Sequence, residues 1–224
     1  MRTNLEICID SCFGIEAAVE GGADRIELCS ELQFGGLTPS LDVLQLASEI
    51  SIPSRSMIRP KKGDFIYSLE DLKRMQSEIE MVRSFNIEGV VFGATLPSGA
   101  LNWDLLEDLV SHSAGLNLTL HRAVDVIHRT TESVQVGIDL GFDTILSSGG
   151  KETALEGLSV LSEMQALANG KINIMPGSGI SSINAKQILS NCHFDWIHSS
   201  CSTQKDAERL TDVQLIKSLK NAII

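Results

Sequence analysis

Short apolar runs alternate with longer amphipathic segments along the whole of this 224-residue chain. The apolar runs predict eight strands, at 4–9, 24–29, 54–59, 89–93, 116–121, 143–147, 171–175 and 194–198. The other segments predict eight helices, at 11–20, 40–50, 69–85, 102–113, 130–140, 152–168, 181–190 and 206–222. Such an alternation folds as a parallel sheet with right-handed crossovers. We therefore predict an α/β fold, a (β/α)8 TIM-like barrel with compact loops that spans residues 1–224 as a single domain. An open, doubly wound sheet is the alternative.

The charge balance of the chain limits its partners. The formal net charge is −11 and no run of Lys or Arg stands out, so we expect no nucleic-acid partner and no membrane partner. No apolar stretch approaches the ~18 residues that a membrane span needs, and the first strand begins too early to leave room for a signal peptide. The five cysteines are irregularly spaced, which indicates reduced thiols in the cytoplasm rather than a disulfide framework.

Polar and charged residues occupy strand positions that face the barrel interior. In the first strand Leu5, Ile7 and Ile9 face the helices, so the alternation places Glu6 and Cys8 inside. The same reasoning turns a further set inward, namely Arg25, Glu27, Cys29, Arg59, Asn117, Thr119, His121, Trp196 and His198. Unpaired, each buried charge costs several kcal/mol, so the set predicts a site at the carboxyl ends of the strands. The alternative is a buried ion-pair network in which Arg25 and Arg59 neutralise the two glutamates.

Two of the cysteines, Cys8 and Cys29, are expected at equivalent positions on neighbouring strands, which run about 4.8 Å apart. Two thiolates this close can share one soft ion, and Cu(I) prefers sulfur ligands. Cys12, just after the first strand, is a candidate third ligand. The alternative is that the cysteines are small buried hydrophobes, which is the commonest use of the residue.

The end of the fifth strand carries an imidazole, a guanidinium and a carboxylate within five residues. His121 is a candidate general acid or base, with Asp125 or Glu27 setting its tautomer. Arg122 is a candidate for holding an anionic substrate through two parallel hydrogen bonds. The alternative is a strand-end histidine capped by the aspartate, with the arginine in solvent.

Three loops after late strands are rich in glycine and serine. They contribute the candidate anion-binding residues Ser148, Gly149, Gly177, Ser178, Gly179, Ser199 and Ser200. Loops after the seventh and eighth strands of such barrels often hold phosphate through backbone N–H groups and hydroxyls. The alternative is that the glycines serve turn geometry alone.

Several motifs taken together resemble those of the CutC family. They are Leu5-Glu6-Ile7-Cys8, the segment 22–29, the segment 35–40, Ile58-Arg59-Pro60, Gly63-Asp64-Phe65, His121-Arg122-Ala123 with Asp125, and the segment 176–179. The resemblance runs from residue 5 to about residue 201. It implies a cytoplasmic TIM-like barrel that forms a homo-oligomer, acts in copper homeostasis and binds Cu(I) through Cys8 and Cys29. One departure is a segment after Ser200 that is shorter than in relatives, which predicts a trimmed rim loop.

These observations leave three hypotheses. The first is a copper homeostasis protein with Cu(I) on the two cysteines. The second is an enzyme acting on a small anionic or phosphorylated metabolite, for which the candidate catalytic residues are Glu6, Glu27, Arg59, His121, Arg122 and Asp125. Cu(I) alone does not explain these hard, charged groups, because it prefers soft ligands. The third is a scaffold whose ion network merely fills the barrel.

Overall fold

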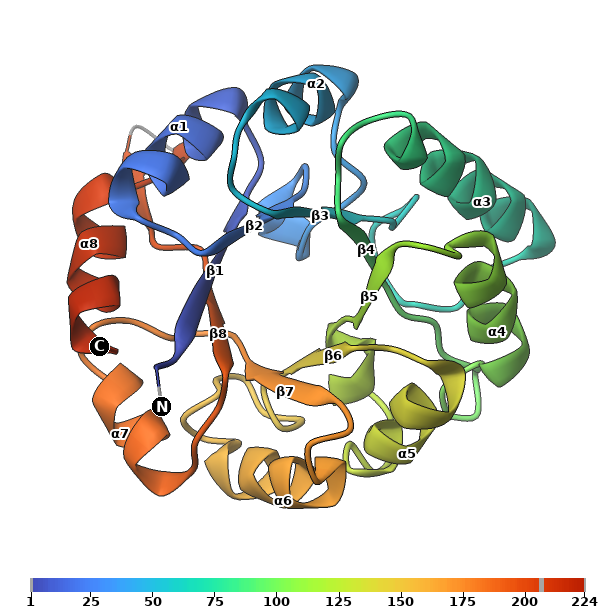
Figure 1. Ribbon diagram of the computed structural model, residues 1–224. Helices are drawn as coiled ribbons and strands as arrows, with labels where there is room; N and C mark the ends of the chain where they lie inside the picture. Colours follow the sequence, from blue (N-terminus) through green and yellow to red (C-terminus); the bar gives the residue numbers. More distant parts are fainter. Residues whose placement is uncertain (1, 206–207, 224) are drawn as a thin grey trace.

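A computed structural model describes residues 2–205 and 208–223, and its centre is a nearly closed barrel of parallel strands (Figure 1). The barrel strands are β1 (Asn4–Ile9), β2 (Arg25–Leu28), β3 (Ser54–Met57), β4 (Gly89–Phe92), β5 (Asn117–Leu120), β6 (Thr144–Ser147), β7 (Asn173–Pro176) and β8 (Trp196–Ser199). Their order around the barrel is β7-β6-β5-β4-β3-β2-β1-β8, and every ladder between them is parallel. The seam lies between β7 and β8.

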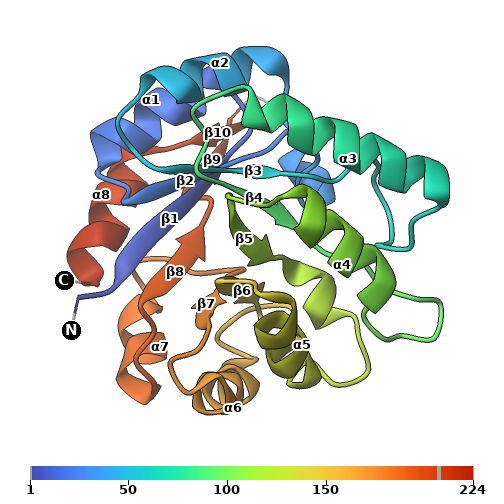
Figure 2. The same cartoon turned by 45° about the vertical axis from the view of Figure 1, so that its right-hand side comes forward.

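Helices follow the strands and form the outer ring (Figures 1 and 2). They are α1 (Cys12–Gly21), α2 (Leu41–Glu49), α3 (Leu69–Arg83), α4 (Trp103–His112), α5 (Glu132–Leu140), α6 (Leu158–Ala168), α7 (Ala185–Asn191) and α8 (Val213–Ala222), with short 3-10 helices η1 (Leu32–Phe34) and η2 (Arg122–Asp125). The predicted (β/α)8 barrel is confirmed, although α6 and α7 begin later than predicted. Among the described residues, no helix combines the length and the apolarity needed to cross a membrane.

The prediction of one helix over 206–222 is wrong at its start. Strands β9 (Ser202–Lys205) and β10 (Glu208–Thr211) pair antiparallel there, and α8 begins only at Val213. The side chain of Asp212 accepts hydrogen bonds from the backbone N–H groups of Gln214 and Leu215, which is the N-cap that sets the helix start. Residues 206 and 207 lie outside the described part of the chain.

The two faces of the strands separate apolar from polar side chains, as predicted. Leu5, Ile7 and Ile9 are fully buried in the layer between the barrel and the helices. Glu6 and Cys8, also buried, stay outside that apolar cluster and face the interior. The polar set is therefore placed by strand alternation inside the barrel.

The amino-terminal end of the barrel has its own buried ion pair. Arg55 of β3 lies 2.7 Å from Asp143 Oδ1 and 3.5 Å from Glu88 Oε1, and it donates to Thr119 Oγ1 at 2.6 Å. Arg55 is not among the residues that the sequence predicted for the interior. Its partners Glu88 and Asp143 directly precede β4 and β6, so these contacts lie at the end of the barrel opposite to the carboxyl ends of the strands.

Candidate functional site

A charged triad lies at the centre of the barrel interior. Glu6 accepts a hydrogen bond from Arg25 Nε at 2.5 Å, and its other oxygen lies 2.8 Å from His198 Nδ1. Burial alone would raise the pKa of Glu6, but Arg25 and His198 outweigh it and hold that pKa at about 2. Burial would likewise lower the pKa of His198, but the acidic groups around it raise that pKa well above its usual range. Glu6 is therefore a carboxylate that faces two cations.

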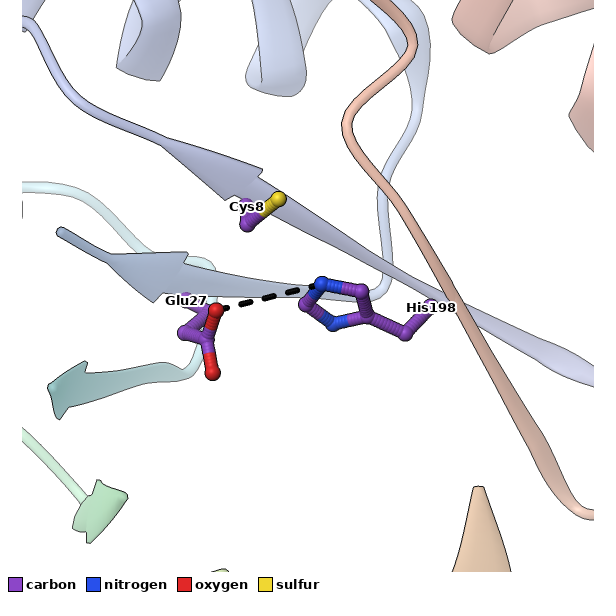
Figure 3. A group of neighbouring side chains, drawn as sticks. All are labelled: Cys8, Glu27 and His198. Atoms are coloured by element: carbon purple, nitrogen blue, oxygen red, sulfur yellow. Dashed lines mark ion pairs between the residues drawn. The ribbon is translucent and has the colours of Figure 1, made fainter. Parts of the chain in front are cut away.

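A thiol, a carboxylate and an imidazole converge just above the triad (Figure 3). Cys8 of β1, Glu27 of β2 and His198 of β8 offer ligand atoms that all lie within 4.8 Å of one another. The strand register explains this, because Cys8 is paired with Glu27 while its neighbour Glu6 is paired with His198. His198 Nε2 lies 3.8 Å from Glu27 Oε2. We call Cys8, Glu27 and His198 the mouth cluster, and three groups at this spacing can hold a metal ion.

The second predicted copper ligand, Cys29, lies beside the mouth cluster. The expectation that Cys8 and Cys29 occupy equivalent positions is wrong, because the register pairs Cys8 with Glu27, two residues earlier on β2. The Cys29 thiol instead donates to Glu27 Oε2 at 3.4 Å. Burial raises the pKa of Cys29 well above its usual range, and the charge of Glu27 adds to the effect.

Cys12 does not reach the interior. It is the first residue of α1, and its thiol lies 3.8 Å from Asp42 Oδ2 in an exposed environment. The expectation of a third ligand from this residue is wrong, because the helix turns its side chain away from the barrel axis.

Glu27 is buried, and one of its oxygens is unsatisfied. Its side chain is 3% exposed, and Oε1 has no hydrogen-bond partner among the described residues. Burial raises the pKa of this carboxyl, and the nearby His198 opposes that rise only in part. A buried carboxyl with a raised pKa is a group that proteins use to take up or release a proton.

Replacing Glu27 by Gln is expected to change the free energy of unfolding by no more than about 1 kcal/mol, because Glu6 still neutralises the nearby cations. Urea unfolding of the Glu27→Gln variant measures this change. A loss of about 3 kcal/mol or more would mean that Glu27 serves the structural ion network. Glu20→Gln, at an exposed position of α1, is the control.

His121 follows β5 and is held as a neutral imidazole. Its Nδ1 accepts the backbone N–H of Ala123 at 3.2 Å, so the ring proton belongs on Nε2. Burial and the positive charge of Arg59 together lower the pKa of His121 to about 3. The expectation that Asp125 or Glu27 sets its tautomer is wrong, since a backbone amide does so. His121 Nε2 has no partner among the described residues.

Asp125 organises a loop instead of orienting the imidazole. Its carboxylate accepts from Ser147 Oγ at 2.6 Å, from the backbone N–H groups of Ser148 and Gly150 at 3.0 Å, and from Arg122 Nε at 2.8 Å. Arg122 also donates to Ser148 Oγ at 3.0 Å. The predicted alternative of a histidine capped by this aspartate is therefore also wrong.

Arg59 does not neutralise the interior glutamates, as the ion-network alternative expected. Its guanidinium donates to the carbonyl oxygens of Phe34, Gly36 and Gly63 at 2.8, 3.0 and 2.8 Å. It also lies 4.7 Å from the centre of the Phe65 ring. The long side chain thus ties together the loops after β2 and β3, and Arg25 alone of the two arginines pairs with a glutamate.

A cavity of about 380 Å³ opens above the mouth cluster. All three cluster residues line it, as do His121 and Arg122. Four of the seven residues predicted for anion binding also line it, namely Ser178, Gly179, Ser199 and Ser200. Arg209 of β10 completes the rim, with bonds to the hydroxyls of the serines at 200 and 202.

The remaining predicted loop residues have structural surroundings. Ser148 bonds to Asp125, and a Cβ on Gly149, whose φ is +71°, would lie 2.4 Å from the Gly157 carbonyl oxygen. A Cβ on Gly177 would lie 2.5 Å from Leu146 Cδ1. In the described chain these three residues lie outside the cavity lining. Glycine is required at both positions for close packing.

Two side chains that line the cavity, His198 and Arg209, were not predicted as site residues from the sequence. Strand alternation predicted that His198 faces the barrel interior. That prediction would have been enough to make His198 a candidate site residue, as it did for Glu6. Arg209 gave no such signal, because the segment around it was predicted as a helix. Its place at the rim depends on the pairing of β9 with β10.

The fold and site define a (β/α)8 barrel with a candidate metal centre at the carboxyl ends of its strands. Comparison with known proteins identifies the particular lineage: the chain belongs to the CutC family, whose model matches residues 3–203. It is 44% identical over 214 residues to a CutC family protein of Sinorhizobium medicae, covering 96% of this chain and 87% of the relative. It is 38% identical to the human copper homeostasis protein cutC homolog, covering 91% of this chain and 75% of the relative.

A solved structure agrees with this assignment. A CutC protein from Streptococcus agalactiae superposes with a TM-score of 0.84 at 28% identity, covering 89% of this chain and 99% of that chain. The barrel architecture and the family resemblance predicted from the motifs are both confirmed.

Proposed function

We propose that this protein acts in copper homeostasis by binding Cu(I) at the barrel mouth, with Cys8 and Cys29 as the sulfur ligands. The observation that carries the proposal is the convergence of the Cys8 thiol and the His198 imidazole within 4.8 Å, with the Cys29 thiol held beside them by Glu27. The names of the human and Caenorhabditis elegans relatives, both copper homeostasis protein cutC homologs, support it. Copper is then the cargo of the protein.

The donor chemistry fits Cu(I) at the sulfur and nitrogen atoms. Cu(I) favours thiolate and imidazole ligands in low coordination number. Glu6 accepts from Nδ1 of His198, which leaves Nε2 facing the cluster. A carboxylate behind a ligand histidine is the usual way in which proteins orient a metal-binding ring. His198 is therefore the third ligand that the geometry favours, and copper displaces the proton that Nε2 carries in the free protein.

Glu27 has a different part in this proposal. A thiol must lose its proton to bind copper, and the Cys29 thiol donates directly to the Glu27 carboxylate at 3.4 Å. That carboxylate is the nearest group able to accept the proton. As a hard oxygen donor it is a poor Cu(I) ligand itself.

The proposal requires reduced thiols. All five cysteines are free, including the buried pair at 8 and 29. Free thiols persist in a reducing compartment, so we place the protein in the cytoplasm. An oxidising compartment would compete with copper binding by oxidising the same sulfurs.

The Cys8→Ser/Cys29→Ser variant is expected to bind Cu(I) at least tenfold more weakly than the wild type, about 1.4 kcal/mol. Anaerobic titration against a chromogenic Cu(I) chelator measures the affinity. Cys192→Ser is the matched control, because that thiol lies near the surface beside α7. Equal copper affinity in the double variant and the wild type would refute the proposal.

A further inference from the structure

The cavity above the mouth cluster is far larger than a copper ion requires. Its volume of about 380 Å³ falls within the ~300–1,000 Å³ that is typical of small-molecule sites. Copper binding would use only the floor, where Cys8 and His198 lie. The remaining space, walled by the loops after β5 and β7 and by the β9–β10 hairpin, is unexplained by the proposed function.

Two buried polar atoms in this cavity lack partners. Glu27 Oε1 and His121 Nε2 are both inaccessible and unbonded among the described residues, and both side chains line the cavity. Unsatisfied buried polar atoms are uncommon in native proteins and call for an explanation. The Nε2 atom carries the ring proton and is a donor, because Nδ1 already accepts from Ala123. A ligand that reaches these two atoms can satisfy them by offering an acceptor to His121 and a polar group to Glu27.

The charge of the lining is opposite to that of the chain. The formal net charge of the protein is −11, yet the lining has one carboxyl side chain, Glu27, against two guanidiniums, Arg122 and Arg209. Guanidinium groups that line a concave site attract anions.

Arg209 is the anchor that the geometry favours for an anion. Among the described residues its side-chain partners are neutral serine hydroxyls, Ser202 at 2.7 Å and Ser200 at 2.6 Å. In contrast, Asp125 pairs with Arg122 at 2.8 Å and neutralises it. Within the described part of the chain Arg209 has no carboxylate partner. A guanidinium held in this way can bind a carboxylate or a phosphate through two hydrogen bonds.

Apolar side chains supply the rest of the wall. Met57, Phe65, Leu146 and Ile180 line the cavity between the polar groups. We propose that the cavity binds a small organic anion, with its carboxylate or phosphate at Arg209, its carbon skeleton against these apolar residues and its polar end between Glu27 and His121. This inference goes beyond copper binding and does not depend on it.

The test uses copper-free protein kept under a Cu(I) chelator. Malate and citrate serve as carboxylate probes, glycerol 3-phosphate and ribose 5-phosphate as phosphate probes, and glycerol and ribose as neutral controls. Thermal shift finds the binders and calorimetric titration measures their affinity. We expect saturable one-to-one binding of at least one anion and none of the neutral compounds, and the class that binds decides between carboxylate and phosphate.

Variants locate the binding. Arg209→Gln and His121→Gln are each expected to weaken it at least tenfold, whereas Arg129→Gln, at an exposed position outside the cavity, leaves it unchanged. Arg209 is exposed, so its variant folds even if His121→Gln does not. Failure of all four anions to bind, or binding that neither variant weakens, would overturn the inference. Because the protein is kept under a Cu(I) chelator, anion binding is measured without copper, and its outcome is independent of the copper titration that tests the proposed function.

Discussion

Replacing Glu6 by Gln is expected to lower the free energy of unfolding by about 3–5 kcal/mol, because it leaves buried cations without their anion. Glu6 is 1% exposed and holds Arg25 Nε at 2.5 Å and His198 Nδ1 at 2.8 Å. For a chain of this size each kcal/mol corresponds to about 2–4 °C, so the melting temperature is expected to fall by roughly 10 °C. Urea unfolding and calorimetry measure the two quantities.

No neighbouring group can take the place of Glu6. Beyond the glutamate, Arg25 contacts the ring of Trp196 at 3.9 Å and the sulfur of Met175 at 3.6 Å, and neither carries a charge. Glu27 lies 3.8 Å from His198 and already accepts from Cys29. The comparison with Glu27→Gln is informative because both glutamates are buried in one barrel. If the two variants lost the same stability, the distinction between a structural Glu6 and a functional Glu27 would be wrong.

The stability that Glu6 contributes is also expected to depend on pH. Its pKa is lowered from 4.5 to about 2 by Arg25 and His198, against the effect of burial. A carboxyl with a depressed folded-state pKa contributes stability above its unfolded pKa and loses it as the pH falls through the folded pKa. The difference between the wild type and Glu6→Gln should therefore shrink by on the order of 3 kcal/mol between about pH 5 and pH 2. A constant difference would contradict the assignment of the charge to Glu6.

The barrel could be predicted from the sequence because its signal is repeated in every strand. Alternation along β1 places Leu5 and Ile7 outside and Glu6 inside, and the structure confirms this. The same rule placed His198 inside, next to Glu6. Local patterns suffice here, because the face of a strand residue depends only on its position in the strand.

The parts of the site that were predicted wrongly depend on relations between distant segments. The position of Cys29 relative to Cys8 follows from the register of β1 and β2, which the sequence pattern does not state. Arg59 was placed by the direction of its Cα–Cβ bond, whereas its long side chain reaches carbonyl groups of two other loops. The rim position of Arg209 required the hairpin of β9 and β10. Side-chain reach and register are properties of the folded chain.

Replacing Asp125 by Ala is expected to lower the free energy of unfolding by about 3–5 kcal/mol, the second large effect that the structure predicts. Its carboxylate accepts from Ser147, Ser148, Gly150 and Arg122, at distances from 2.6 to 3.1 Å. A hydrogen bond to a charged group is worth about 1.5–3 kcal/mol. Because all these donors lose the same carboxylate, their contributions are not independent and the expected total is smaller than their sum. Urea unfolding measures the loss, with Asp139→Ala, at an exposed position of α5, as the control.

The Asp125→Asn variant sharpens this test. Both carboxylate oxygens accept, Oδ1 from Ser147 and Gly150 and Oδ2 from Ser148 and Arg122. An amide must turn its NH2 group toward one pair of donors, so asparagine is expected to restore only part of the lost stability. A catalytic Asp125 would behave differently, since its removal would leave the free energy of unfolding nearly unchanged. A loss of unfolding free energy below about 1 kcal/mol in Asp125→Ala would therefore reject the structural role. A large loss would support the conclusion that Asp125, although it lies four residues after His121, holds the loop after β6 and does not orient the imidazole.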